Sequence, residues 1–280
     1  ELADRRCGAQ AATNRALISV PDYRPRSMTF LRSLLFSLYL LALTPPYACL
    51  CFIVFPFMNA ENRFRFVRGW TRLVIWAGRL ICGIHYRIEG MEQAQSMLDK
   101  HVVLLSKHQS AWETVAYVAL MPKPLCFVFK RELLLVPFFG WALGMLKMVH
   151  INRKDGPRAF ASAARQGRDR LAEGAWIIMF PEGTRTASGL EKPRYKSGGA
   201  RLAVETGAWV IPMAVNSGRL WPRNSFLKYP GMITISIGAP IASANKTADM
   251  LNQEVETWIE AEMRRIDPDS YRRAGNQATA

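Results

Sequence analysis

A histidine followed five residues later by a glutamate is the feature of this sequence best suited to chemistry. His108 and Glu113 lie in the segment Lys-His-Gln-Ser-Ala-Trp-Glu, between an expected strand over Val102–Ser106 and an expected helix over Ala111–Leu120. A carboxylate that holds one imidazole nitrogen fixes the tautomer and leaves the other nitrogen to act as a base. Ligands of α/β sheets bind beyond the carboxyl ends of the strands, so this position suits an active site.

A structural interpretation of the same glutamate stays open. Ser110-Ala111-Trp112-Glu113 also fits a capping box, in which the carboxylate serves the start of the helix. One carboxylate is not expected to serve fully both the helix start and the histidine. The chain has no G-x-S-x-G elbow and no motif of an activated cysteine. A base without a protein nucleophile favours direct deprotonation of a substrate hydroxyl.

Cationic residues stand at or just after the ends of three further expected strands: Lys130, Arg153 and Arg185. The last of these closes the turn Glu182-Gly183-Thr184-Arg185, where glycine permits a tight backbone path and glutamate can orient its neighbours. Arginine binds phosphate through paired hydrogen bonds and lysine binds it as a point charge. Their convergence predicts a phosphate site near His108. In a chain with 37 lysines and arginines, each could instead be a solvated surface residue.

Short apolar strands alternate with helices in the part of the chain that must position these residues. The expected strands are His85–Glu89, Val102–Ser106, Leu125–Lys130, Met148–Asn152, Ala175–Phe180, Val210–Val215 and Met232–Gly238. The expected helices are Ala111–Leu120, Pro157–Glu173, Gly198–Thr206 and Thr247–Arg265. This alternation predicts one α/β domain over 85–267, with a central, largely parallel or mixed sheet flanked by helices. The chain contains neither GxGxxG nor a P-loop sequence, which leaves dinucleotide and P-loop chemistry unsupported.

The N-terminal part of the chain is apolar in a way that suits a membrane. Residues 1–27 are expected to form a flexible basic arm, and the segment 33–60 that follows carries no charged residue. A helix of roughly 20 residues crosses a hydrocarbon core of about 30 Å. Pro45-Pro46 is expected to break the helix, and the portion 33–44 would rise only about 18 Å. Basic residues on both sides favour a re-entrant hairpin with both ends in the cytoplasm. One kinked span and a buried core hairpin are the alternatives.

The next segment has the periodicity of an amphipathic helix. Apolar residues recur at three- and four-residue steps from Phe66 to Ile84, with four arginines between them: Arg65, Arg68, Arg72 and Arg79. Such a helix suits an anionic membrane surface, although it could equally pack on the domain with solvated arginines. Residues 28–84 are therefore predicted to form a membrane-associated helical hairpin and amphipathic helix.

Charge and cysteine content limit the partners. The 280-residue chain has a net charge of +15, which predicts an anionic partner. Nucleic acid is disfavoured because no recognition motif accompanies the long uncharged segment. The five cysteines form no CxxC pair, which predicts free thiols in a reducing compartment and no zinc or other metal site. The residues 268–280 are expected to be disordered.

Four segments together resemble the glycerolipid acyltransferases. These are His-x4-acid at 108–113, Lys-x-Glu-Leu at 130–133 with a following Pro-Phe-Phe-Gly, Phe-Pro-Glu-Gly-Thr-Arg at 180–185, and Ile-Pro at 211–212. Their order and separations over roughly 80–240 look most similar to the bacterial 1-acyl-glycerol-3-phosphate, or lysophosphatidic acid, acyltransferases. The family commonly has aspartate where this chain has Glu113, and the longer side chain can reach the imidazole with a different rotamer.

The resemblance implies a role for each of these residues. His108 would be the general base and Glu113 its partner. Lys130, Arg153 and the turn Glu182, Gly183, Thr184 and Arg185 would bind the glycerol phosphate, and Ile211 and Pro212 would help shape the acyl site.

The resemblance also implies a reaction and a location. An acyl group would pass from acyl-CoA or acyl carrier protein to the free hydroxyl of lysophosphatidic acid, giving phosphatidic acid without metal or cofactor. The partners would be membrane lipids, and the catalytic domain would lie on the cytoplasmic face of the inner membrane. Alternatives are another lyso-lipid acceptor, such as lyso-ornithine lipid, or a non-catalytic membrane-binding module.

Overall fold

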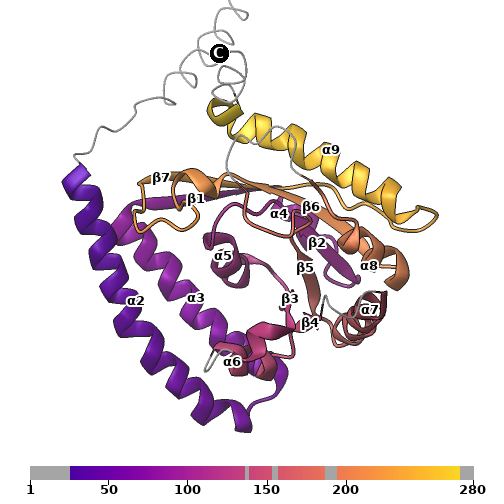
Figure 1. Ribbon diagram of the computed structural model, residues 1–280, viewed down its shortest axis with the longest axis horizontal. Helices are drawn as coiled ribbons and strands as arrows, with labels where there is room; N and C mark the ends of the chain where they lie inside the picture. The colour runs from indigo at the N-terminus through magenta and orange to yellow at the C-terminus, as the bar shows by residue number, and fades with distance from the viewer. Residues whose placement is uncertain (1–25, 136–138, 153–156, 187–193, 272–280) are drawn as a thin grey trace, which may run out of the picture.

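A mixed, mostly parallel sheet forms the centre of the molecule (Figure 1). The computed structural model describes residues 26–135, 139–152, 157–186 and 194–271. Within them the strand order is β1-β7-β6-β2-β5-β3-β4, and every neighbouring pair is parallel except β6 and β7. The strands are β1 Ile84–Glu89, β2 Val102–Ser106, β3 Leu125–Lys130, β4 Val149–Ile151, β5 Trp176–Met179, β6 Trp209–Val215 and β7 Gly231–Ile237. The predicted α/β class is confirmed, and each strand begins and ends within one residue of its predicted bounds.

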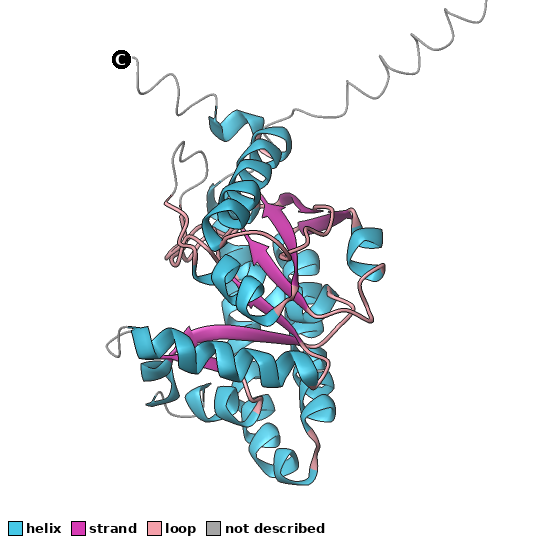
Figure 2. Ribbon diagram, turned by 90° about the vertical axis from the view of Figure 1, so that its right-hand side faces the viewer, coloured by secondary structure: helices cyan, strands magenta, loops and turns pink. Residues whose placement is uncertain are grey.

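Helices cover both faces of the sheet (Figure 1, Figure 2). The strand β2 is buried at all five residues, as expected for a parallel strand with a helix layer on each side. Leu104 packs in the cluster that includes α3 (Ala60–Cys82) and α5 (Trp112–Leu120). Its neighbours Val103 and Leu105 pack on the other face, against α7, α8 and α9. The three helices of that second layer are Pro157–Ala172, Gly198–Thr206 and Ala248–Ile266.

The predicted helices of the domain are confirmed within one residue at each end, but several short helical elements were not predicted. These are α4 Met91–Gln95, η2 Arg131–Leu135, α6 Phe139–Met145 and the 3₁₀ turn η4 Ser217–Arg219. None of them is longer than seven residues. Segments of this length contain too few turns for an apolar periodicity to be recognised.

The predicted break at Pro45-Pro46 is wrong. Helix α2 runs without interruption from Arg26 to Val54, with both prolines inside it (Figure 1). Proline removes a backbone donor from a helix, but a neighbouring helix can hold the chain in place. Here α3 does so on both sides of the proline pair. Tyr47 Oη donates to the Phe66 carbonyl at 2.7 Å, and Trp70 Nε1 donates to Thr44 Oγ1 at 3.3 Å.

The hairpin therefore turns later than predicted and uses the amphipathic helix as its second arm. The 3₁₀ turn η1 Phe55–Phe57 ends α2, and Asn59 caps α3 by accepting from the backbone N–H of Asn62 at 2.9 Å. Arg63 donates through Nε to the Phe55 carbonyl at 2.9 Å and closes the turn. Helix α3 packs between α2 and α5 on this side of the domain.

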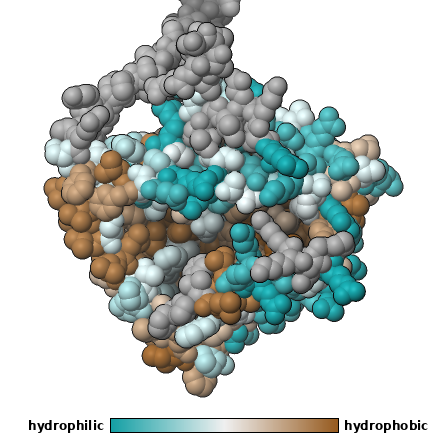
Figure 3. All heavy atoms as spheres, in the orientation of Figure 1, coloured by the Kyte–Doolittle hydropathy of each residue, from teal (hydrophilic) through white to brown (hydrophobic). Residues whose placement is uncertain are grey.

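Helix α2 leaves most of its apolar surface uncovered. Within the described residues, Ser27–Phe57 is the one stretch long and apolar enough to cross a membrane, judged by length and composition alone. Only 11% of its most apolar window is buried. Figure 3 shows apolar side chains gathered on the side of the molecule where α2 lies. Exposed members of this surface are Phe30, Leu31, Leu35, Leu38, Leu41, Ile53 and Phe57.

The two ends of the chain differ from the predicted boundaries. Arg26 and Ser27, which were assigned to a flexible arm, already belong to α2. Pro268–Tyr271 form a helical turn rather than a disordered tail. Proline favours the first turn of a helix, and Tyr271 Oη bonds to Glu260 on α9. Residues 1–25 and 272–280 lie outside the described residues.

Candidate active site

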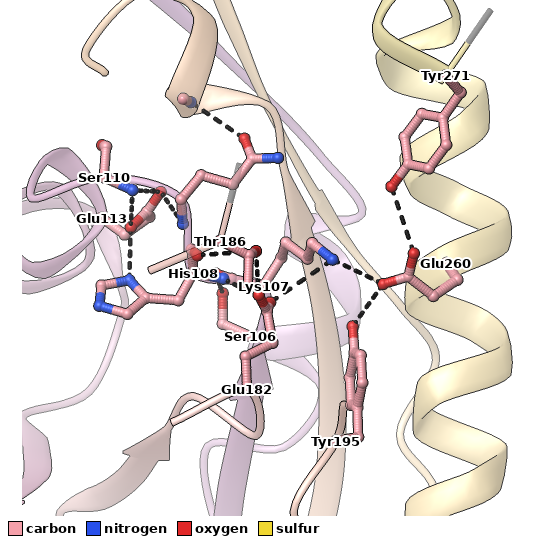
Figure 4. Close-up of polar contacts among 12 residues, drawn as sticks. Ser106, Lys107, His108, Ser110, Glu113, Glu182, Thr186, Tyr195, Glu260 and Tyr271 are labelled. Carbon is pink, nitrogen blue, oxygen red and sulfur yellow. Dashed lines mark hydrogen bonds and ion pairs between the residues drawn. The ribbon is translucent and has the colours of Figure 1, made fainter. Parts of the chain in front are cut away.

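His108 and Glu113 form a hydrogen-bonded pair at the carboxyl end of β2 (Figure 4). The distance from His108 Nδ1 to Glu113 Oε2 is 2.8 Å. The Glu113 side chain is fully buried, whereas that of His108 is 15% exposed. The imidazole stacks on the Phe180 ring with centroids 3.8 Å apart and planes at 16°. A carboxylate on Nδ1 and an aromatic ring against one face hold the imidazole still and leave Nε2 as the basic atom.

Glu113 serves the start of α5 and the histidine at the same time, so the expectation that it could not do both is wrong. Ser110 N donates to both carboxylate oxygens, at 2.9 and 3.0 Å, and Gln109 N donates to Oε1 at 3.2 Å. A carboxylate has about four lone-pair sites on two oxygens, which is enough for all of these donors. The start of the helix thus fixes the carboxylate that holds the histidine.

Lys107, the residue before His108, lies in a buried polar cluster between the histidine and Glu260 (Figure 4). Its side chain is 1% exposed, and its ammonium lies 2.7 Å from Glu260 on α9 and 3.6 Å from Glu182. Glu182 also accepts from the backbone N–H of His108 at 3.0 Å and from the Thr186 hydroxyl. Burial raises the pKa of Glu182, and the Lys107 ammonium opposes that shift. Glu182 therefore holds the backbone of the histidine, in keeping with the expectation that this glutamate orients its neighbours, and its role as a substrate ligand stays a prediction.

The turn that carries Arg185 is bonded to the histidine loop. Thr186 N donates to the His108 carbonyl at 2.8 Å, which places the preceding Arg185, half-buried, beside that loop. Gly183 has φ +67°, and a Cβ atom there would lie 2.8 Å from Lys196 Nζ. The Lys196 side chain thus lies over Gly183. Thr184, the residue after Gly183, is exposed. Lys196 is a cation at this turn that the sequence analysis did not single out.

Lys130 ends β3 at the same edge of the sheet as His108. The strands β2, β5 and β3 are neighbours and parallel, so their carboxyl ends meet at one edge. Lys130 is exposed there. Phe127 on the same strand lies 6.4 Å from the Phe180 ring that supports the histidine. The third predicted cation, Arg153, lies outside the described residues.

The two residues assigned to an acyl site lie on opposite faces of β6. Ile211 is fully buried in the core on the α3 and α5 face. Pro212 faces α9, where it lines a shallow hollow with Ile241 and Trp258. The structure thus places neither side chain beside His108, and their role in acyl binding stays a prediction.

An apolar surface lies instead between the site and the hairpin. Leu133, Leu135 and Trp141, on η2 and α6, are 38%, 81% and 52% exposed. The α2–α3 turn is adjacent, since Arg63 Nη1 donates to the Met145 carbonyl at 2.9 Å and the Phe52 and Trp141 rings lie 6.0 Å apart.

The segment after β6 contributes residues that the sequence analysis missed. The Ser217 hydroxyl donates to Glu113 Oε1, and Gly218 N donates to Gln109 Oε1 at 3.0 Å. Polar residues directly after an apolar strand were the available signal, because β6 is parallel to β2 and ends at the same edge. Within the described residues no cluster of three or more His, Cys, Asp or Glu side chains could hold a metal ion.

Known proteins are similar to this chain in both sequence and fold. A sequence profile described as Acyltransferase matches residues 85–216. The 1-acyl-sn-glycerol-3-phosphate acyltransferase of Pseudomonas aeruginosa is 40% identical over 242 residues, which cover 85% of this chain and 92% of the relative. This chain belongs to the glycerolipid acyltransferases. The family resemblance predicted from the residues is confirmed, and the protein is an acyltransferase.

A more distant relative and a solved structure are also similar to this chain. A 1-acyl-sn-glycerol-3-phosphate acyltransferase of Chlamydomonas reinhardtii is 35% identical over 156 residues, which cover 55% of this acyltransferase and 46% of the relative. The crystal structure of the 1-acyl-sn-glycerophosphate acyltransferase PlsC from Thermotoga maritima superimposes with a TM-score of 0.68 at 21% identity. That comparison covers 85% of this chain and 97% of the other, and it shows a shared fold.

Proposed function

We propose that this acyltransferase moves a fatty acyl group from the thioester of acyl-CoA or acyl carrier protein to the free hydroxyl of 1-acyl-glycerol-3-phosphate, giving phosphatidic acid. The observation that carries the proposal is the His108–Glu113 pair, with 2.8 Å between Nδ1 and Oε2, beside the turn that bears Arg185. The names of the relatives support this acceptor.

His108 acts as the general base in this reaction. Its Nε2 takes the proton from the acceptor hydroxyl while the oxygen attacks the thioester carbonyl carbon. The tetrahedral intermediate collapses, the carbon–sulfur bond breaks, and the departing thiolate takes the proton from the imidazolium. Glu113 stabilises the imidazolium between these steps, as an orienting carboxylate does in a triad. No covalent bond to the enzyme is needed.

Cations around the site bind the acceptor phosphate. Arg185 and Lys130 stand at strand ends on the edge that carries the histidine, and Lys196 lies over Gly183 in the same turn as Arg185. A phosphate held there brings the acceptor hydroxyl to the imidazole, which converts an encounter between two molecules into a positioned reaction. A substrate without phosphate lacks this anchor.

The hairpin brings the domain to its lipid substrates. The exposed apolar side of α2 and the exposed arginines of α3, which are Arg65, Arg72 and Arg79, suit the surface of an anionic bilayer. The exposed Leu135 and Trp141, next to the hairpin, offer further apolar surface for an acyl chain. We place the catalytic domain on the cytoplasmic face of the inner membrane, since basic residues precede and follow the apolar segment.

A purified assay with a labelled acyl donor tests the base. His108→Ala should lower transfer to lysophosphatidic acid by about 10²- to 10⁴-fold with an unchanged unfolding transition. His101→Ala is the matched control, because His101 is exposed ahead of β2 and should be as active as the wild type. Near-normal transfer by His108→Ala would overturn the mechanism.

The acceptor and its phosphate are tested in the same assay. Arg185→Ala should raise the KM for lysophosphatidic acid by about tenfold or more, because it loses a charge-assisted pair of hydrogen bonds. Arg168→Ala, on the exposed side of α7, should leave KM unchanged. An unchanged KM in Arg185→Ala would count against the phosphate role. Faster transfer to lyso-ornithine lipid than to lysophosphatidic acid would identify lyso-ornithine lipid as the acceptor and contradict the proposal.

A further inference from the structure

Ser217 reaches the catalytic carboxylate from a distant part of the chain. Its hydroxyl donates to Glu113 Oε1, and the two residues are 104 positions apart in the sequence. Both are fully buried. An ionised carboxylate only accepts hydrogen bonds, so the hydroxyl is the donor.

Within the described residues, the other donors to Glu113 come from its own loop. They are the backbone N–H groups of Gln109 and Ser110 and the imidazole of His108. These donors belong to the same segment as Glu113, so they tie the carboxylate only to its own loop. Ser217 stands on the element after β6 and ties the carboxylate to the sheet.

The segment that carries Ser217 is anchored on both sides. On the active-site side, Gly218 N donates to Gln109 Oε1 at 3.0 Å, and Arg223 Nη1 donates to the Arg185 carbonyl at 2.9 Å. The segment 217–230 therefore contacts both the histidine loop and the turn that bears the predicted phosphate ligand.

Helix α2 holds the same segment from the other side. The Trp221 ring meets Phe36 edge to face with centroids 5.3 Å apart. Lys228 N donates to Ser33 Oγ at 2.9 Å, and Ser33 is fully buried. The segment thus spans from the membrane-facing helix to the catalytic carboxylate, and its conformation is fixed at both ends.

We propose that Ser217 is a positioning residue for acyl transfer. Its hydroxyl holds Glu113 Oε1 so that Oε2 stays on His108 Nδ1 and keeps Nε2 aimed at the acceptor hydroxyl. It touches neither substrate, so its loss slows the chemical step and leaves substrate binding alone. The inference rests on the proposed role of His108 as the base.

Steady-state kinetics of Ser217→Ala test the inference. The kcat should fall by about 10- to 100-fold, the effect of one hydrogen bond to a charged group, while the KM for each substrate stays within about twofold. Ser217→Thr keeps the hydroxyl and should recover most of the kcat. Ser217→Cys keeps the volume with a weaker donor and should fall between Ala and wild type. Ser236→Ala is the matched control, because Ser236 is a buried serine whose hydroxyl bonds to Glu262 on α9, away from the site.

The outcomes separate this inference from the proposed function. A wild-type kcat in Ser217→Ala, with His108→Ala inactive, overturns the role of Ser217 and leaves the base in place. An equal loss of kcat in Ser217→Ala and Ser236→Ala, with equal loss of stability, also overturns it, since general destabilisation then explains both. An active His108→Ala overturns the proposed function, and the role of Ser217 falls with it.

Discussion

Lys107 and Glu260 form an ion pair inside the protein, with 2.7 Å between Nζ and Oε1. The lysine directly precedes His108, and the glutamate lies 153 residues later on the C-terminal helix α9. Tyr195 Oη donates to the same oxygen at 2.8 Å, and Glu182 lies 3.6 Å from the same ammonium. One buried cation therefore faces two carboxylates. This arrangement joins the histidine loop, the Glu182 turn and α9 into one unit.

We expect Lys107→Met to lower the free energy of unfolding by about 3–5 kcal/mol, because it leaves two buried carboxylates without their cation. The double variant Lys107→Met/Glu260→Gln should lose less than the sum of the two single changes, since the uncompensated charge is smaller. Urea unfolding in detergent micelles measures all three. Lys147→Met removes an ion pair whose side chains are about half exposed and should change stability by no more than about 0.5 kcal/mol. Additive losses would contradict the coupling.

The turn before Arg185 requires glycine for two reasons that can be separated. Gly183 has φ +67°, and a Cβ atom there would also meet the Lys196 side chain. Gly207 has the similar φ of +65° with no atom within 4 Å of a Cβ. Both alanine variants should lose about 1–2 kcal/mol of stability from the left-handed backbone alone. Only Gly183→Ala should also displace Lys196 and raise the KM for lysophosphatidic acid.

The pair of variants is compared by thermal unfolding and by kinetics. Gly207→Ala should bind the acceptor as well as the wild type does. If Gly183→Ala had the same KM as Gly207→Ala, the Lys196 side chain would have no part in acceptor binding.

Substitutions at two positions of helix α2 should affect different properties, one the stability of the fold and the other membrane binding. Phe36 is 1% exposed and packs on Trp221, whereas Leu41 is 68% exposed. Phe36→Ala should lower the free energy of unfolding by about 3–5 kcal/mol through a core cavity. Leu41→Asp should leave stability unchanged and weaken sedimentation with vesicles of anionic phospholipid, because it places a charge on the lipid-facing side. Vesicle binding unaffected by Leu41→Asp would exclude α2 as the membrane contact.

The cysteine in the core of the domain should be chemically inert in the folded protein. Burial raises the pKa of the Cys126 thiol to about 12. Only the thiolate reacts, so at pH 8 a maleimide should label Cys126 only after unfolding. Ser162→Cys, at an exposed position of α7, supplies a control thiol that should react at once. Mass spectrometry of the labelled peptides follows both sites, and rapid labelling of Cys126 in the folded protein would contradict its burial.

The local pattern of the sequence was enough to predict the strands, the main helices and the contact between His108 and Glu113. A short apolar run such as Val102–Ser106 indicates a strand, because a strand that is buried on both faces carries apolar side chains at successive positions. His108 and Glu113 could be paired from spacing alone, since five residues across one strand-to-helix turn leave their side chains within reach. The family resemblance rested on these same short segments and is confirmed.

The tertiary structure decided what supports the pair. Helix α2 continues through Pro45-Pro46 because Tyr47 and its neighbours bond to α3, which no property of the proline pair itself reveals. Ser217 and Glu260 reach the site from 104 and 153 residues away. Sequence periodicity reports which face of an element is buried but not which element covers it. The His108–Glu113 pair could therefore be predicted from the sequence, whereas the residues that hold the pair in position became visible only when the sheet brought distant segments to one edge.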